Sequence, residues 1–203
     1  LIQNASTVGA LDLKIFKSEQ NNYTFFDDIK NNKFKILYLL NSDNLKFEKN
    51  DEFIIYQGSH GDRGAEIADV ILPSAAYTEE NGLYQNLEGR VQECRKASYP
   101  AGESLESWKV LNKLTHAYKN KNLFDSFNAL REETLKKLVN FDSINKLPKY
   151  KEPSKKINNS FKSEKIFINL IDYYFSNSIS RASKVMSECR DIKLKHLKSG
   201  TNN

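Results

Sequence analysis

The stretch Ile36-Leu37-Tyr38-Leu39-Leu40 decides the fold class of this chain. It does not alternate between apolar and polar residues, and this pattern is typical of a strand that is buried on both faces of a parallel sheet. The polar residues that follow, Asn41-Ser42-Asp43, predict a loop. We therefore expect a buried strand that ends at this loop.

Two further segments repeat this pattern along the chain. Residues 53–56 form a second short apolar run, which leads into Gln57-Gly58-Ser59-His60-Gly61-Asp62. Residues 65–68 predict a brief helical turn, and residues 69–72 predict a third strand that stops at Pro73. Three such strands describe part of a parallel α/β sheet, in which ligands bind just outside the carboxyl ends of the strands. On this geometry, residues 41–43 and 58–63 would edge a cleft.

The remainder of the chain predicts four regions of different character. Residues 1–100 would form the α/β part, with turns and short extended segments over 77–92, and residues 101–141 would form a pair of amphipathic helices. Residues 142–165 are rich in Lys, Ser and Asn and contain two prolines, which favours a mobile or surface-draped linker. Residues 166–203 would form a C-terminal tail, whose apolar start must be buried against this domain or against a partner.

Composition excludes several classes of protein. The chain has 203 residues, of which 39% are hydrophobic, so it can bury a core. Its apolar runs are far shorter than the ~18 residues that a membrane helix needs, so we expect no direct membrane insertion. The net charge is +5, divided into −3 over residues 1–144 and +8 over residues 145–203. Because the basic end has no clustered Lys/Arg run, we do not expect nucleic-acid binding.

The cysteines and the single methionine suggest a piece of a longer chain without a cluster of its own. Cys94 and Cys189 are the only cysteines, whereas iron–sulfur clusters and structural zinc need about four ligands. We expect both thiols to be reduced, although their spacing does not exclude a disulfide. Because Met186 is the only methionine and the chain opens with Leu1, the simplest interpretation is a fragment.

His60 is the first candidate for chemistry, with Asp62 and Arg63 beside it. It could act as an acid–base catalyst positioned by a carboxylate, or it could be a loop histidine that bonds a backbone group. We favour the second interpretation because no nucleophile or metal ligand is evident nearby. The glycines at 58, 61 and 64 lack the spacing of a nucleotide fingerprint and suit tight turns instead.

The other polar candidates also favour structural roles. Glu79, Glu80 and Glu88, with Arg90 and Arg95, could form a carboxylate pair of the glycosidase kind, but an ion-paired structural turn is the better interpretation. His116 and His196 have no ligand-spaced partners, so we expect them at the surface. We therefore expect no catalytic, cofactor-binding or metal-binding residue in this chain.

Several motifs nevertheless carry a resemblance that covers nearly the whole chain. The run Gln57-Gly58-Ser59-His60-Gly61-Asp62, followed by Ala68-Asp69-Val70-Ile71-Leu72-Pro73 and Asn86-Leu87-Glu88-Gly89-Arg90, resembles the large iron–sulfur (75 kDa) subunits of NADH:ubiquinone oxidoreductase (complex I). The frame after residue 68 is shared with the wider molybdopterin oxidoreductase superfamily. Glu106-Ser107-Trp108-Lys109 and the run from Tyr174 to Ser183 agree with the mitochondrial and alphaproteobacterial form.

The resemblance implies a fold and a role. The fold would be part of a parallel-sheet, molybdopterin-oxidoreductase-like α/β domain, followed by helices and an extended C-terminal tail. The role would be structural, in a subunit that supports electron transfer from NADH to quinone coupled to proton translocation. Such a subunit carries 2Fe–2S and 4Fe–4S clusters in an N-terminal region that is absent here, and its domain is thought to have lost molybdenum. Asn86, Glu88, Gly89 and Arg90 match a superfamily motif, but we expect no cofactor bound by this chain.

The resemblance also implies partners and a location, and it leaves alternatives. The partners would be other subunits of the peripheral arm, with residues 166–181 as a candidate contact. The location would be peripheral on the inner membrane, on the matrix side in a mitochondrion or the cytoplasmic side in a bacterium. One alternative is the cofactor-binding end of a molybdenum enzyme such as a formate dehydrogenase, with a pterin at the strand-end cleft. Another is a free-standing basic interaction module.

Overall fold

The computed structural model describes residues 7–15, 22–42, 44–139, 141–149 and 172–198. The chain divides into two compact units, Leu1–Tyr150 and Lys151–Asn203, and each is described by itself. Within the described ranges, no helix combines the length and the hydropathy that crossing a membrane would require.

A three-stranded parallel sheet forms the centre of the first unit. Its strands are β1 (Ile36–Leu40), β2 (Phe53–Gly58) and β3 (Val70–Pro73), in the order β1-β2-β3. The short helix α3 (Arg63–Glu66) lies in the connection between β2 and β3. The α/β class and the parallel sheet predicted from the sequence are confirmed.

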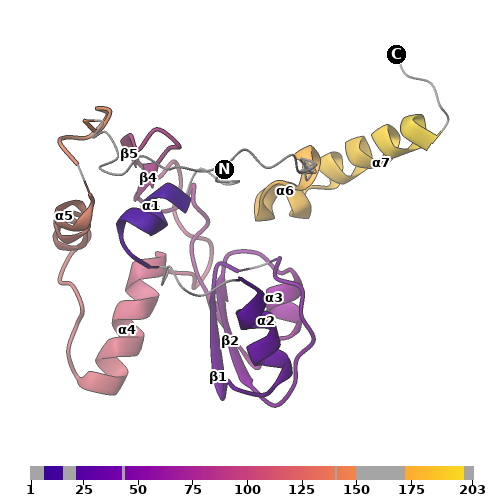
Figure 1. Cartoon of the computed structure of the whole chain (residues 1–203), viewed down its shortest axis with the longest axis horizontal. Helices are drawn as coiled ribbons and strands as arrows, with labels where there is room; N and C mark the ends of the chain where they lie inside the picture. The colour runs from indigo at the N-terminus through magenta and orange to yellow at the C-terminus, as the bar shows by residue number, and fades with distance from the viewer. Residues whose placement is uncertain (1–6, 16–21, 43, 140, 150–171, 199–203) are drawn as a thin grey trace, which may run out of the picture. The chain divides into compact units, whose positions relative to one another are not determined.

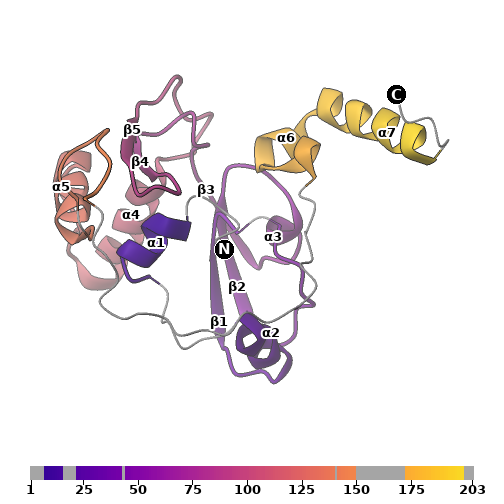
Figure 2. The same ribbon diagram turned by 45° about the horizontal axis from the view of Figure 1, so that its top comes forward.

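One face of this sheet carries the hydrophobic core. Both views place α2 (Asn22–Lys30) and α3 on the same side of the strands (Figures 1 and 2). On that side the buried side chains of one cluster come from α2, β1 and β2: Ile29, Leu37, Leu39, Ile54 and Tyr56. Because alternate strand residues share a face, the paired residues Leu37 and Ile54 point into this core together.

The opposite face of the sheet is only partly covered by the residues that the structure describes. Ile36, Leu40, Phe53 and Val70 are 63%, 44%, 46% and 39% exposed, respectively. The expectation that these strands are buried on both faces is therefore wrong for β1, for the first residue of β2 and for β3 in the described structure. An unbroken apolar run predicts that both faces will be covered, but it does not say whether the covering residues belong to the same chain.

A β-hairpin lies beside the sheet in the first unit. It pairs β4 (Gly82–Gln85) with β5 (Val91–Cys94) in antiparallel register, Gly82 opposite Cys94. Helix α1 (Thr7–Asp12) packs against β4, and the Gln85 side-chain amide donates to the Asp12 carboxylate over 2.7 Å. This contact ties the start of the described chain to the hairpin.

Two helices follow where the apolar stripes predicted a helical pair. Helix α4 (Ser107–Lys119) ends at Asn120, which adopts a left-handed conformation, and α5 (Phe127–Lys137) begins after its N-cap, Ser126. The side chain of Asn112 fixes the connection, because it donates to the carbonyl of Phe124 and accepts from the backbone amides of residues 123 and 124.

Residues 142–149, the start of the predicted linker, lie against the hairpin. The backbone amide of Asn145 donates to the carbonyl of Val91 over 2.8 Å, and Arg90 donates to the carbonyl of Asn145 over 3.3 Å. The linker over residues 142–165 stays a prediction. Residues 150–165 of the predicted linker lie outside the described residues.

The second unit is helical where it is described. It comprises the 3₁₀ turn η1 (Tyr173–Phe175), α6 (Ser178–Ala182) and α7 (Lys184–Lys198). The expectation of an extended tail is therefore wrong for residues 173–198. Arg190 holds η1 onto α7, since it pairs with the Asp172 carboxylate over 2.5 Å and its guanidinium lies 4.5 Å from the centre of the Phe175 ring. Residues 166–171, part of the segment expected to contact a partner, lie outside the described residues.

Candidate functional site

The carboxyl ends of β1 and β2 are the first place to look for a ligand site, and here the two loops pack on each other. The backbone amide of Asn41 donates to the carbonyl of Gln57 over 2.8 Å. A Cβ atom on Gly64 would lie 2.8 Å from the carbonyl oxygen of Ser42 and 2.9 Å from the ring of Tyr56. The buried Tyr56 ring therefore fills the space where residues 41–42 and the loop after β2 meet. Asp43 lies outside the described residues.

The glycines of this loop serve the packing of Tyr56. A Cβ atom on Gly58 would overlap the Tyr56 hydroxyl, whereas a Cβ atom on Gly61 would meet nothing within 4 Å. None of the three glycines has a positive φ. The expectation that they serve tight turns is therefore wrong for Gly58 and Gly64, because these two positions need the absence of a side chain rather than an unusual backbone conformation.

The candidate His60, Asp62 and Arg63 make local structural contacts. The Tyr56 hydroxyl donates to the His60 carbonyl over 2.9 Å, and the His60 ring lies 2.9 Å from the Ser59 hydroxyl. Asp62 caps α3 by accepting from the amide of Arg63, and the Arg63 guanidinium pairs with Glu66. The ring contact expected with a backbone group is instead a contact with the Ser59 side chain, and the structural role of His60 stays a prediction.

A buried polar network occupies the carboxyl end of β2, on the face of the sheet opposite the hydrophobic core. Gln57 is completely buried. The Tyr38 hydroxyl donates to its Oε1 over 2.5 Å, and its Nε2 donates to the carbonyl of Ser107 at the start of α4 over 3.1 Å. Both polar ends of the Gln57 side chain are thus satisfied by the chain itself. Sequence reasoning did not find this network, because its members are 19 and 50 residues apart.

Glu80 extends this network from the segment before β4. Its carboxylate accepts from the backbone amide of Ser107 over 2.7 Å and from the Ser107 hydroxyl over 3.1 Å. Burial raises the pKa of Glu80 above its ordinary value, although the hydrogen bonds from Ser107 act in the opposite direction. The carboxylate therefore anchors the start of α4 at a cost in desolvation.

Glu106 forms a second buried acidic group at the start of α4. Its carboxylate accepts from the indole of Trp108 over 3.0 Å and pairs with Lys96 and Lys109 over 3.1 and 3.2 Å. Burial acts to raise the pKa of Glu106, but the hydrogen bonds from Lys96, Trp108 and Lys109 together lower it. The sequence indicated Glu106 only as part of a family motif and did not predict this buried ion-paired site.

The predicted ion-paired turn around Glu79, Glu80, Glu88, Arg90 and Arg95 is not formed in the described structure. Instead, Glu79 accepts from the backbone amide of Ala76, Glu80 binds Ser107, and Arg90 donates to the Asn145 carbonyl. The expectation of mutual ion pairs is wrong because Glu79 and Glu80 accept from backbone amides, and the Glu88 carboxylate accepts from the side-chain amide of Asn86 over 3.3 Å. Arg95 contributes its carbonyl to a weak contact with the Cys94 thiol.

The motif Asn86-Leu87-Glu88-Gly89-Arg90 builds the turn of the hairpin. The Asn86 side-chain oxygen accepts from the amides of Glu88 and Arg90 over 3.0 and 2.9 Å. Gly89 has a φ of +82°, and a Cβ atom there would lie 2.8 Å from the ring of Pro148. Every described contact of this motif therefore supports the turn and its packing against residues 141–149.

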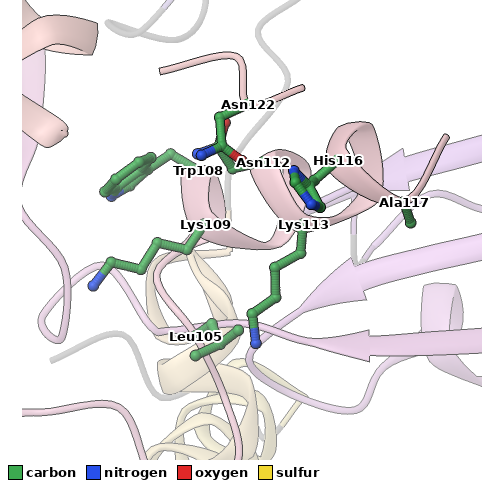
Figure 3. A pocket seen from close by; sticks show the side chains of 8 residues that line it. All are labelled: Leu105, Trp108, Lys109, Asn112, Lys113, His116, Ala117 and Asn122. Carbon is green, nitrogen blue, oxygen red and sulfur yellow. The ribbon is translucent and has the colours of Figure 1, made fainter. Parts of the chain in front are cut away.

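A surface pocket of about 390 Å³ lies along α4 (Figure 3). Lys109 and Lys113 extend from the helix on the same side as Leu105, and Trp108 and His116 complete much of the lining. His116, expected at the surface, thus borders this hollow, while His196 is exposed on α7. No group of three or more His, Cys, Asp or Glu side chains in the described ranges is arranged to hold a metal ion, and the thiols of Cys94 and Cys189 are free.

Comparison with known proteins assigns this chain to a family. Residues 1–117, more than half of the chain, match the family model of molybdopterin oxidoreductases. The chain belongs to the molybdopterin oxidoreductase family. Residues 139–189 of this molybdopterin oxidoreductase family member match a second model, that of the C-terminal part of the G subunit of NADH-ubiquinone oxidoreductase.

Curated relatives of this family member are named as subunits of NADH-ubiquinone or NADH-quinone oxidoreductase. The chain is 36% identical to the NADH-ubiquinone oxidoreductase 75 kDa subunit of Reclinomonas americana over 93% of its own length and 28% of that protein. It is 37% identical to the G subunit of NADH-quinone oxidoreductase of Rickettsia felis, over 96% and 28% of the two chains. The mitochondrial 78 kDa subunit of Candida albicans is 39% identical, over 93% and 27%. The resemblance stated from the sequence is confirmed, and the chain spans just over a quarter of the length of these relatives.

Proposed function

We propose that this chain is the structural C-terminal portion of the iron–sulfur subunit of respiratory NADH:quinone oxidoreductase. In this role it supports electron transfer from NADH to quinone coupled to proton translocation, without a catalytic residue of its own. The names of the relatives and the match of residues 139–189 to a complex I model support this assignment over a molybdenum enzyme such as a formate dehydrogenase.

The observation that supports the scaffold role is that both polar atoms of the Gln57 side chain are hydrogen-bonded within the chain. In open α/β sheets a ligand binds outside the carboxyl ends of the strands, where it needs polar groups that are free to face it. At the end of β2 both ends of the Gln57 amide are engaged by Tyr38 and Ser107, and on the other face Tyr56 fills the space beside the glycines. These contacts join three segments of the chain, which is what a supporting domain requires.

The finer parts of the assignment follow from this role. Residues 1–100 would be the α/β part, 101–141 the helical pair, 142–165 a linker and 166–203 a family-specific tail. The chain would bind no iron or molybdenum itself, and the clusters would lie in the rest of the subunit. Its partners would be other subunits of the peripheral arm, on the matrix or cytoplasmic side of the inner membrane.

The proposal is tested on the purified chain in two measurements. Elemental analysis and electron paramagnetic resonance should find less than a tenth of an equivalent of iron or molybdenum and no redox-active signal. A tagged portion of the Reclinomonas americana subunit, comprising the part that this chain does not match, should then retain the chain on an affinity column. A molybdenum centre in the isolated chain, or a failure of the two polypeptides to associate, would overturn the assignment.

A further inference from the structure

The face of the sheet opposite the hydrophobic core is apolar over three successive rows of paired residues. The register pairs Ile36 with Phe53 in the first row and places Tyr38, Ile55 and Val70 together in the second. The third row holds Leu40, Gln57 and Leu72. Because residues two apart on a strand share a face, these side chains form one continuous surface, with Gln57 as its buried polar member.

The described part of the first unit covers this surface incompletely: α4 lies on this side of the strands in both views (Figures 1 and 2), and Tyr38, Ile55 and Leu72 are half-buried. Helices α2 and α3 lie on the other side of the sheet in both views (Figures 1 and 2). Helix α4 reaches the surface through its first residue, Ser107, which accepts from Gln57. The first row is open to solvent, because Ile36 and Phe53 are the two most exposed of these residues. Leu40, at the edge of the third row, is also exposed.

A parallel sheet with an exposed apolar patch on one face is an incomplete structural unit. Parallel sheets occur almost only with both faces covered, and the covering elements are helices that present an apolar stripe. A contiguous exposed patch of large apolar side chains marks an interaction surface rather than a solvent-facing one. We therefore expect an amphipathic helix to cover this surface.

We propose that this face binds helices of the polypeptide that corresponds to the unmatched part of the curated relatives. Those relatives have nearly three quarters of their length outside the matched segment, which supplies enough chain to cover a sheet face. A second copy of this chain suits the face less well, since it would stack two parallel sheets directly on each other. The inference rests on the proposed function and names the surface through which the chain joins the rest of the subunit.

The test places a photoreactive benzoylphenylalanine at Phe53 in the full chain. The matched control carries the same group at Tyr118, an aromatic side chain that is 85% exposed on α4. Each variant is mixed with the unmatched portion of the Reclinomonas americana subunit, irradiated and analysed by mass spectrometry. We expect at least tenfold more cross-linking to helical segments of that portion from position 53 than from position 118.

A second variant tests the surface by affinity. The exposed Ile36 is replaced by Lys, with Tyr118→Lys as the control, and circular dichroism verifies that both variants keep their fold. Ile36→Lys should weaken binding at least tenfold, while Tyr118→Lys should change it less than twofold. If the two polypeptides associate but position 53 links only to a second copy, or is no more reactive than position 118, this inference fails and the proposed function stands. If they do not associate at all, the proposed function fails as well.

Discussion

Gly58 and Tyr56 share one small volume at the end of β2, where a side chain on the glycine would collide with the tyrosine hydroxyl. The two residues are two positions apart on the strand, so they point to the same face. That hydroxyl donates to the carbonyl of His60 and holds the loop that follows. The family motif that runs through this loop is therefore tied to the packing of an aromatic ring.

Replacing Gly58 by Ala should lower the free energy of unfolding by about 1–3 kcal/mol, the usual cost of overpacking a core. Gly61→Ala is the matched control, because a Cβ atom there meets nothing within 4 Å. Urea denaturation followed by circular dichroism measures both variants. Equal stability of the two variants would refute the packing role of Gly58.

Removing the Tyr38 hydroxyl should leave the Oε1 atom of the buried Gln57 without this donor. An unsatisfied buried acceptor costs about 1–3 kcal/mol, so Tyr38→Phe should reduce the free energy of unfolding by that amount. Tyr118→Phe on the exposed side of α4 removes the same group and should change the stability by less than about 0.5 kcal/mol. The comparison is made by thermal and urea unfolding, and a harmless Tyr38→Phe substitution would contradict the network.

Glu80 should make the stability fall as the pH rises above the ordinary range of a glutamate. Its pKa is raised in the folded chain by burial, so between the ordinary and the raised value the folded state holds a proton that the unfolded state has lost. The contribution is fully present below the ordinary pKa and is lost as the pH rises through the folded pKa. Urea unfolding at closely spaced pH values between about 4 and 8 should show this slope, and Glu80→Gln should flatten it. An unchanged slope in the variant would exclude Glu80 as its source.

Asp69 should make the free energy of unfolding decrease as the pH falls into the acidic range. The hydrogen bond from Lys49 is the largest cause that lowers its pKa, followed by that from the amide of Ile54 at 2.7 Å. Its contribution is therefore present above the ordinary pKa of an aspartate and is lost as the pH falls through the folded value. Asp69→Asn should lower the stability at neutral pH and reduce the loss between about pH 4 and 2. Asp27→Asn, on the exposed side of α2, is the control, and equal behaviour of the two variants would contradict the assignment.

The positions of the three parallel strands and of α4 and α5 could be predicted because they depend on local patterns, whereas the helices of residues 173–198 were not predicted. The apolar runs at 36–40 and 53–56 and the stop at Pro73 predicted the three strands, and the apolar stripes of residues 101–141 predicted α4 and α5. The polar contacts of the strand ends could not be predicted in the same way. The pattern of charges around Glu80 indicates an ion-paired turn, yet this carboxylate binds Ser107, which is 27 residues away.

The sequence by itself determined the α/β class, the parallel strands and membership of the molybdopterin oxidoreductase family, since these follow from hydrophobic period and from short motifs. Only the tertiary structure decided that one face of the sheet keeps exposed apolar side chains within the described residues, that Tyr56 requires Gly58 and Gly64, and that Gln57 joins β1 to α4. The physical reason is that burial and hydrogen bonding belong to pairs of groups brought together by folding. A pattern along one segment shows only which groups must be buried or hydrogen-bonded, and not which groups will contact them.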